Sequence, residues 1–179
     1  ISVNSGNSAL HLSLLSLGIN QKSKVLTSTN SFIASANCIL MAGANPILSD
    51  IDLQDGNMET KKPLPNSDCI IPVHLYGNPC NFDSVKQYGE EMKVPIVEDA
   101  CQAHGATYKN KKVGSLGTLG CFSFYPTKNM TVCGDGGMVT TDDDELTKTI
   151  ISLRDNGRKT RTEHDKLGYT MRLNTISAA

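Results

Sequence analysis

The run Cys69-Ile70-Ile71-Pro72-Val73-His74-Leu75 is almost wholly apolar, and the turn residues Gly77-Asn78-Pro79 end it. The spacing of residues 82–92 predicts an amphipathic helix, and a second apolar run follows in Pro95-Ile96-Val97-Glu98-Asp99. Short apolar strands that alternate with helices are typical of a largely parallel sheet. This stretch therefore predicts an α/β fold.

The same alternation extends along the rest of the chain. The predicted helices are 8–17, 31–42 and 142–154, and the predicted strands are 24–28, 46–52, 119–124 and 138–141. Residues 53–67 have the Gly, Pro and Asn content of a loop. We therefore expect a mostly parallel, doubly wound sheet with helices on both faces, in which ligands bind beyond the carboxyl ends of the strands.

The composition is that of an ordinary soluble globular protein. The chain has 179 residues, of which 39% are hydrophobic and 20% charged, and its formal net charge is -1. Lys and Arg are dispersed, so we expect no nucleic-acid partner. The sequence contains no apolar run of membrane-spanning length and no signal-peptide pattern, so we expect no membrane partner.

The cysteines and histidines favour neither disulfides nor a metal site. Six cysteines occur without a Cys-x-x-Cys pair, which is typical of reduced core residues in a cytoplasmic protein. The histidines His11, His74, His104 and His164 lack the spacing of metal ligands. His11 falls among helix leucines and is expected to be a hydrogen-bonded core residue, whereas His104 follows Asp99 closely and is expected near the site.

One lysine has the sequence context of a covalent catalyst. Lys128 follows the apolar run Cys121-Phe122-Ser123-Phe124 and the turn Tyr125-Pro126-Thr127, and glycines at 134, 136 and 137 come soon after. A lysine held in a partly desolvated pocket can attack carbonyl carbons, and glycines let the backbone approach a ligand closely. The alternative is an exposed surface lysine, as most lysines are.

Asp99 ends a strand of apolar residues, so its carboxylate is expected at the sheet edge and partly desolvated. A carboxylate in that setting needs a cationic or hydrogen-bonding partner. It could cap a helix or form a structural ion pair. It could also be the counter-ion of the protonated pyridine nitrogen of pyridoxal phosphate, which acts as an electron sink.

Further candidates are expected at the same edge of the sheet. Asn7 and Ser8 open a predicted helix, where free N–H groups and the helix dipole favour an anion; a plain helix cap is the alternative. Ser123, just upstream of Lys128, offers a hydroxyl to the same anion. Phe32 lies at the start of another helix, where its ring could cover a flat cofactor or pack in the core.

Taken in order along the chain, these motifs resemble the DegT/DnrJ/EryC1/StrS family of sugar aminotransferases. These are pyridoxal-phosphate enzymes of fold type I, the aspartate-aminotransferase-like fold. The resemblance extends over nearly the whole chain. Its most specific runs are Glu98-Asp99-Ala100-Cys101-Gln102-Ala103-His104-Gly105 and Ser123-Phe124-Tyr125-Pro126-Thr127-Lys128-Asn129.

The resemblance implies a role for each candidate residue. Lys128 is implied to bind pyridoxal 5'-phosphate covalently, and Asp99 to pair with the pyridine nitrogen. Gln102 is implied to lie beside the ring and its 3-hydroxyl, and Phe32 to stack on the ring. The implied phosphate ligands are Asn7, Ser8 and Ser123.

By the same resemblance, residues 1–179 form the large cofactor-binding domain of a longer chain, without its first helix and its C-terminal small domain. Ile1 lies in what reads as a strand-to-helix turn, and Ala178-Ala179 end the chain within a helical pattern, which favours the same expectation. Two positions depart from the commonest family pattern. Tyr125 stands where a histidine is frequent, and Thr170 stands where an asparagine usually reaches the phosphate of the neighbouring subunit.

The implied reaction is a two-stage transamination in the cytoplasm. The amino group moves from an amino-acid donor, usually glutamate, to a keto group of a nucleotide-linked sugar, in cell-surface polysaccharide or amino-sugar biosynthesis. Lys128 moves the proton at the donor's α carbon. A homodimer with a shared active site is also implied. Two alternatives remain: an acceptor of the keto-inositol type, and a regulatory protein that binds pyridoxal phosphate without catalysis.

Overall fold

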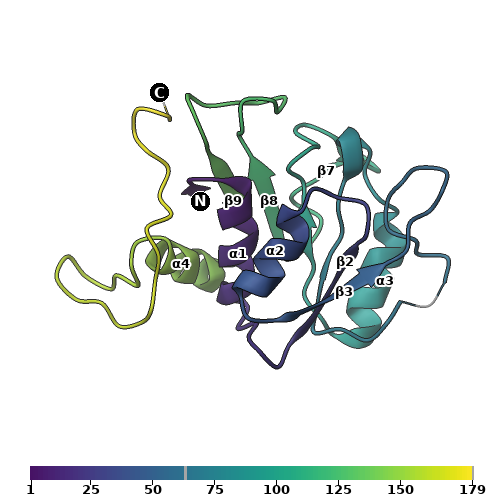
Figure 1. Ribbon diagram of the computed structural model, residues 1–179, viewed down its shortest axis with the longest axis horizontal. Coiled ribbons are helices and arrows are strands. Elements are labelled where there is room, and N and C mark those ends of the chain that lie inside the picture. The colour runs from purple at the N-terminus through teal and green to yellow at the C-terminus, as the bar shows by residue number, and fades with distance from the viewer. Residues whose placement is uncertain (63, 179) are drawn as a thin grey trace.

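The computed structural model describes residues 1–62 and 64–178, and Figure 1 shows a central sheet with helices packed against it. Pro63, in the predicted loop, and Ala179 lie outside the described residues. The main strands are β1 (Ser2–Val3), β2 (Lys24–Ser28), β3 (Asn45–Ser49), β4 (Cys69–Ile71), β5 (Val97–Asp99), β8 (Leu119–Ser123) and β9 (Gly137–Thr140). The helices are α1 (Gly6–Ser16), α2 (Ala34–Met41), α3 (Phe82–Met92) and α4 (Asp144–Leu153). Smaller elements are the 3-10 turn η1 (Leu75–Gly77) and the hairpin of β6 (Thr107–Tyr108) and β7 (Lys111–Lys112).

The sheet is mixed, with a parallel majority. Hydrogen-bonded pairing gives the order β3-β2-β4 in one ladder and β5-β8-β9-β1 in another. Two isolated parallel bridges, Ile70 to Ile96 and Val73 to Asp99, make β4 and β5 neighbours. Strand β9 is antiparallel to β8, and β1 is antiparallel to β9. The prediction of a mostly parallel sheet is confirmed, whereas the sequence analysis did not predict the antiparallel edge.

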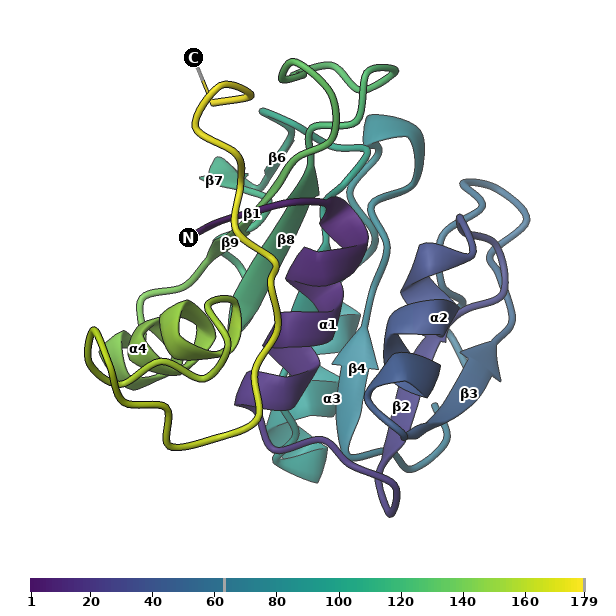
Figure 2. The same cartoon turned by 60° about the vertical axis from the view of Figure 1, so that its left-hand side comes forward.

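Helices cover both faces of the sheet because neighbouring strand residues point to opposite sides. Val25 and Ile71 lie in a core shared with α1, α2 and α4. Leu26 and Ile70, each one position away, lie in a second core with Phe82 and other residues of α3. Figure 2 shows α1 and α2 in front of the strands and α3 behind them. The doubly wound arrangement is therefore confirmed.

Local side chains set where the helices begin. The Asp143 carboxylate accepts the N–H groups of Glu145 and Leu146, so the acidic start predicted for α4 is confirmed. Helix α2 begins three residues later than predicted, at Ala34, and its N-cap Ile33 makes no side-chain capping bond. None of the helices in the described part of the chain has the length and apolar character of a membrane span.

Residues 175–178, where a helical pattern is predicted, form turns. The Asn174 side chain accepts the N–H of Ile176, as a helix cap does, and the Asn174 carbonyl accepts the Ala178 N–H at 3.1 Å. The Ile176 side chain is exposed, so no burial stabilises a short helix there.

His11 is buried on α1, as predicted, but the predicted hydrogen bonding of its ring is absent from the described structure. Neither ring nitrogen makes a well-formed hydrogen bond, and the ring packs edge-on against Tyr169 with centroids 5.2 Å apart. Burial lowers the pKa of His11 below its ordinary value of 6.5, and a contact with the Met41 backbone opposes this only in part. The folded protein therefore holds this imidazole neutral.

We expect His11 to make the protein sensitive to mild acid. Below pH 6.5 the unfolded chain takes up a proton at His11 that the folded protein does not, so stability falls; well above that pH both states are neutral. The loss should be at most about 1.4 kcal/mol per pH unit within this window. Urea unfolding of His11→Leu near neutral pH and about two units lower should reveal a smaller acid loss than in the wild type.

His164→Gln is the control, because the His164 side chain is exposed. An acid loss of equal size in the wild type and in His11→Leu would contradict the assignment.

Candidate active site

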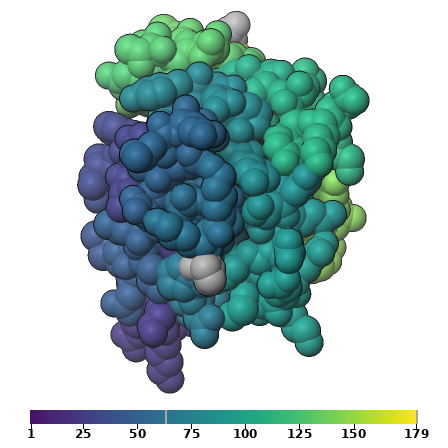
Figure 3. Space-filling model, turned by 90° about the vertical axis from the view of Figure 1, so that its right-hand side faces the viewer, coloured from purple at the N-terminus to yellow at the C-terminus, as the bar shows by residue number. Residues whose placement is uncertain are grey.

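A cavity of about 550 Å³ lies beyond the carboxyl ends of β5 and β8. The loop that follows β8 extends beyond the strand ends in Figure 1 and forms the green surface at the top of Figure 3. Six of the seven residues predicted for the site line the cavity: Asn7, Phe32, Asp99, Gln102, Ser123 and Lys128. Parallel strands end at the same sheet edge, which is why segments far apart in sequence meet here.

Asp99 supplies a buried carboxylate at the cavity wall. It is 5% exposed, and its position at the end of β5 follows from parallel pairing with Cys121 of β8. Oδ2 accepts a hydrogen bond from Ser35 Oγ at 2.7 Å, and Oδ1 accepts the Cys101 N–H at 3.2 Å. Among the described residues, Asp99 has no ion-pair partner. A buried carboxylate is costly unless a positive charge pairs with it, so a cation in the cavity would stabilise Asp99.

Lys128 supplies an uncommitted amine. It is half-buried in the loop after β8, and its N–H donates to Tyr125 O at 2.8 Å. Lys128 forms no ion pair within residues 1–62 and 64–178. Burial raises the pKa of the Cys101 thiol on the cavity wall, and the nearby Lys128 charge opposes this in part. The predicted alternative of a fully exposed surface lysine does not describe this side chain.

The start of α1 offers hydrogen-bond donors to an anion. The Ser5 hydroxyl accepts the Ser8 N–H at 3.1 Å, while the N–H groups at the first positions of a helix have no partner within it. Gly6 and Asn7, at those positions, line the cavity, as does the Ser123 hydroxyl from the end of β8. Ser8 is buried behind this wall and does not line it, and its Oγ accepts a hydrogen bond from Ser5.

The side chain of Asn7 lies at the same end of the cavity. Its Oδ1 has no hydrogen-bond partner among the described residues, and its Nδ2 meets the Met41 sulfur at 3.4 Å. The amide offers an anion a donor only when Nδ2 faces the cavity, whereas the backbone N–H groups do not depend on such a turn. The backbone N–H groups and the hydroxyl of Ser123 are therefore the stronger donors at this end of the cavity.

Gln102 is oriented by a strained turn. Its Oε1 accepts the Tyr76 N–H at 3.0 Å, which leaves both Nε2 hydrogens free to donate. Tyr76 has φ 52° within η1, a left-handed conformation that non-glycine residues rarely adopt. Strain of this kind clusters at functional sites. This contact was not predicted from the sequence.

Aromatic side chains stand at the cavity mouth. Phe32 lines the cavity and is 69% exposed, so the alternative of core packing is wrong. Tyr125 lines the opposite side and is also exposed. An exposed aromatic ring at the rim of a cavity is available to cover a flat ligand.

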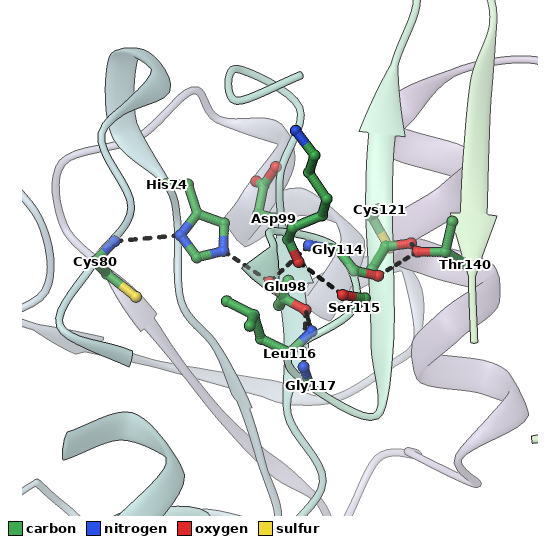
Figure 4. A network of polar contacts seen from close by, with 12 residues as sticks. His74, Cys80, Glu98, Asp99, Gly114, Ser115, Leu116, Gly117, Cys121 and Thr140 are labelled. Atoms are coloured by element: carbon green, nitrogen blue, oxygen red, sulfur yellow. Dashed lines mark hydrogen bonds and ion pairs between the residues drawn. The ribbon is translucent and has the colours of Figure 1, made fainter. Parts of the chain in front are cut away.

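Glu98, one residue before Asp99, lies in a separate buried network (Figure 4). Its Oε1 accepts the N–H groups of Leu116 and Gly117, and its Oε2 accepts the N–H of Gly114. His74 Nδ1 accepts the Cys80 N–H, so Nε2 carries the hydrogen that His74 shares with Glu98 Oε2 at 3.0 Å. The sequence analysis singled out both segments but not this network.

His104 lies behind the cavity and does not line it. Its ring centroid is 5.6 Å from that of Phe122 and 5.9 Å from that of Phe124. Burial lowers the pKa of His104, a contact with the Ser123 backbone opposes this, and the Lys128 charge adds to the lowering. His104 therefore lies close to two cavity-lining residues, Ser123 and Lys128, as expected, although it does not line the cavity itself.

The sequence model of the DegT/DnrJ/EryC1/StrS aminotransferase family matches residues 1–179. The chain belongs to this family. The UDP-N-acetyl-3-dehydro-alpha-D-glucosamine 3-aminotransferase of Acidithiobacillus ferrooxidans is 39% identical, over 97% of the chain and 48% of the relative. A pleiotropic regulatory protein of Geobacillus stearothermophilus is 38% identical, over 100% of the chain and 49% of the relative.

A solved structure of NtdA from Bacillus subtilis with bound cofactor PMP superposes with a TM-score of 0.91 at 32% identity. The alignment covers 99% of this chain and 42% of that one. The resemblance to the DegT/DnrJ/EryC1/StrS family and the expected aminotransferase fold are confirmed. The chain spans about half the length of the curated relatives it matches.

Thr170, which departs from the commonest family pattern, does not line this cavity. Its hydroxyl donates to Asn156 Oδ1 at 3.0 Å, and the side chain is exposed. A role at the phosphate of a neighbouring subunit therefore stays a prediction.

The close contact at Gly6 leads to a testable prediction. A Cβ at this position would lie 2.7 Å from Ser123 Cβ and 2.9 Å from Cys101 Sγ, closer than carbon atoms tolerate. Gly6→Ala should separate the start of α1 from the end of β8, destabilise the protein by about 1–3 kcal/mol, and weaken binding of pyridoxal phosphate about ten-fold or more. Cofactor titration of the apoprotein, followed by fluorescence, measures the second effect.

Gly89→Ala on α3 is the matched control, because its Cβ would meet the end of the flexible Ile96 side chain at 3.0 Å and the Val94 backbone oxygen at 3.3 Å, away from the cavity. This variant should lose some stability and keep its cofactor affinity. Wild-type affinity in Gly6→Ala would contradict the prediction.

Proposed function

We propose that this chain forms the cofactor site of a pyridoxal-phosphate aminotransferase. The reaction moves an amino group from an amino acid, with glutamate as the donor, to a keto group of a nucleotide-linked sugar. The observation that carries this proposal is that Lys128 and the buried carboxylate of Asp99 line the same cavity, and that neither forms an ion pair with any residue the structure describes. We also propose that the reaction takes place in the cytoplasm.

The cavity residues fit pyridoxal phosphate. A protonated pyridine nitrogen would give Asp99 the cation it lacks, and the donors at the start of α1 and at Ser123 suit a phosphate. The free Nε2 hydrogens of Gln102 suit an oxygen on the ring. Phe32 is free to cover the ring's face. Ser8, which lies behind the wall, would act by holding Ser5 in place.

When bound, pyridoxal phosphate supplies an electron sink for charge that develops on the substrate. Asp99 would pair with the pyridine nitrogen and hold its proton. Lys128 Nζ would provide the point of covalent attachment and, as a free amine, would move the proton at the α carbon of the amino acid. The donors at the start of α1 and at Ser123 would hold the phosphate and so orient the ring, and this orientation would decide which substrate bond is broken.

The names of the relatives support a nucleotide-linked sugar as the acceptor. The Acidithiobacillus relative is named for a UDP-linked dehydro-glucosamine. The Geobacillus relative is named as a pleiotropic regulatory protein, which supports a second candidate, a regulator that binds the cofactor without turnover. The retention of Lys128 beside Asp99 favours the enzyme, because a regulator needs no movable amine.

Covalent attachment at Lys128 is the direct test. Borohydride reduction of the full-length protein with its cofactor, followed by peptide mapping, should place the pyridoxyl group on Lys128. Lys128→Ala should retain weak cofactor binding through the phosphate donors and lose transamination by about a hundred-fold or more. Lys111→Ala, on the exposed strand β7, should match the wild type.

The same sample separates the two candidate functions. An absorption band that changes on addition of glutamate and is restored by nucleotide-linked keto-sugars supports the aminotransferase. A reduced cofactor on any other lysine would refute the site, and a band that no amino donor changes would favour the regulator. A band restored only by keto-inositols would correct the acceptor.

We propose further that the protein is a homodimer whose two sites are shared. Phe32 and Tyr125 line the cavity and are exposed, and three more exposed apolar side chains lie on segments next to residues that line it: Ile33, Tyr76 and Met130. Apolar groups gathered in this way are typical of a surface that a partner covers. A two-fold dimer is the commonest closed arrangement, and it would bring Thr170 of one subunit to the phosphate of the other.

Mixed dimers test the sharing. Lys128→Ala removes the amine, and Thr170→Glu should place a charge that repels the partner's phosphate, so each variant alone should have little activity. Unfolded together and refolded in equal amounts, they should regain about a quarter of the wild-type activity, because half of the dimers are mixed and each carries one complete site. No recovery, despite mixed dimers detected by mass spectrometry, would refute sharing through Thr170. A fully active monomer in sedimentation would refute the dimer.

A further inference from the structure

A chain of two hydroxyl groups leads from Asp99 away from the cavity. Ser35 Oγ lies 2.7 Å from Asp99 Oδ2, and Ser31 Oγ lies 2.6 Å from Ser35 Oγ. Ser35 is 2% exposed, and Ser31 is half-buried. Ser35 lies in the first turn of α2 and Ser31 three residues before that helix, whereas Asp99 ends β5, so this contact joins segments that are distant in sequence.

The direction of the hydrogens follows from the chemistry of the three groups. An ionised carboxylate only accepts hydrogen bonds, so Ser35 must donate its one hydrogen to Asp99. The Ser35 oxygen is then left as an acceptor, and Ser31 donates to it. The two serines therefore form an ordered donor chain that ends on the carboxylate.

The Ser35 hydroxyl serves Asp99 rather than the helix in which it lies. The N-cap of α2 is Ile33, which makes no side-chain capping bond. The hydroxyl of a serine at the start of a helix normally accepts a hydrogen bond from a free backbone N–H. Here the hydroxyl instead meets a carboxylate, and a hydrogen bond to a charged acceptor is roughly twice as strong as one between neutral groups.

Ser35 and the Cys101 N–H are the two donors to Asp99 in the described structure, one on each carboxylate oxygen. Donors of this kind stabilise the ionised form and fix the plane of the carboxylate. Each oxygen keeps one further lone pair with which to accept a proton donor from the cavity. Without Ser35, the carboxylate would be freer to rotate, and a proton shared with a ligand would move toward Asp99.

We propose that Ser35 is a positioning residue that fixes the Asp99 carboxylate at the cavity wall, with Ser31 orienting Ser35. This inference rests on the proposed function, since the proton that Asp99 holds is that of the cofactor's pyridine nitrogen. Ser35 touches neither the substrate nor the reacting atoms. Its effect reaches the reaction through the charge on Asp99.

The test reads the pyridine nitrogen directly. Full-length protein is loaded with pyridoxal phosphate labelled with 15N in the ring, and the 15N chemical shift reports whether that nitrogen is protonated. In Ser35→Ala the signal should move from the wild-type position toward that of Asp99→Asn, and cofactor affinity should fall about ten-fold. Ser35→Thr, which keeps the hydroxyl, should restore both, and Ser31→Ala should give a smaller change of the same sign.

Ser13→Ala is the matched control, because Ser13 is another fully buried serine, and its Oγ meets Cys121 Sγ at 3.3 Å rather than Asp99. Its 15N signal should stay at the wild-type position. A wild-type signal and affinity in Ser35→Ala, or an equal shift in Ser13→Ala, would overturn the inference while leaving the proposed function intact. Failure of the wild-type protein to bind the labelled cofactor would overturn both.

Discussion

Two adjacent carboxylates at the end of β5 differ in how fully the protein pairs their charge, and the site depends on this difference. Glu98 is fully buried, but three backbone N–H groups and His74 satisfy both of its oxygens. Asp99, on the other face of the same strand, has two donors and no cation among the described residues. The protein thus compensates one buried charge internally and leaves the next for a ligand to complete.

The compensated carboxylate makes the incomplete one usable. Glu98 ties together the end of β5, the 114–117 turn and, through His74, the segment that leads into η1. That segment carries Tyr76, whose backbone N–H orients Gln102. Removing Glu98 or His74 would leave buried polar groups without hydrogen-bond partners. The network is therefore stable enough to hold the unfavourable φ angle of Tyr76 in place. The Glu98 network on one face of β5 therefore supports the cavity wall that Asp99 forms on the other face.

Much of this could be predicted from the sequence, because apolar runs and their alternation with helices report burial directly. The parallel strands, α1, α3 and the cavity positions of Asp99, Lys128 and Gln102 follow from that pattern and from the family motifs. The antiparallel edge formed by β1 and β9 could not be predicted, because strand direction depends on where a distant segment returns. The contacts of Ser35 and Tyr76 share this limit: serine and tyrosine are common residue types, and only the tertiary structure brings them to Asp99 and Gln102.

The placement of Ser8 and Asn7 illustrates a finer limit. Both residues suit a phosphate by type. Ser8, however, lies behind the cavity wall, and Asn7 lines the cavity with a side-chain oxygen that no described donor meets. An anion at a helix start is bound mainly by N–H groups that every residue except proline possesses, so side-chain identity there reports capping and packing more than binding. The glycine at position 6 carries the clearer signal. It is needed because α1 approaches Ser123 so closely, and that approach brings the helix start and the end of β8 to one anion site.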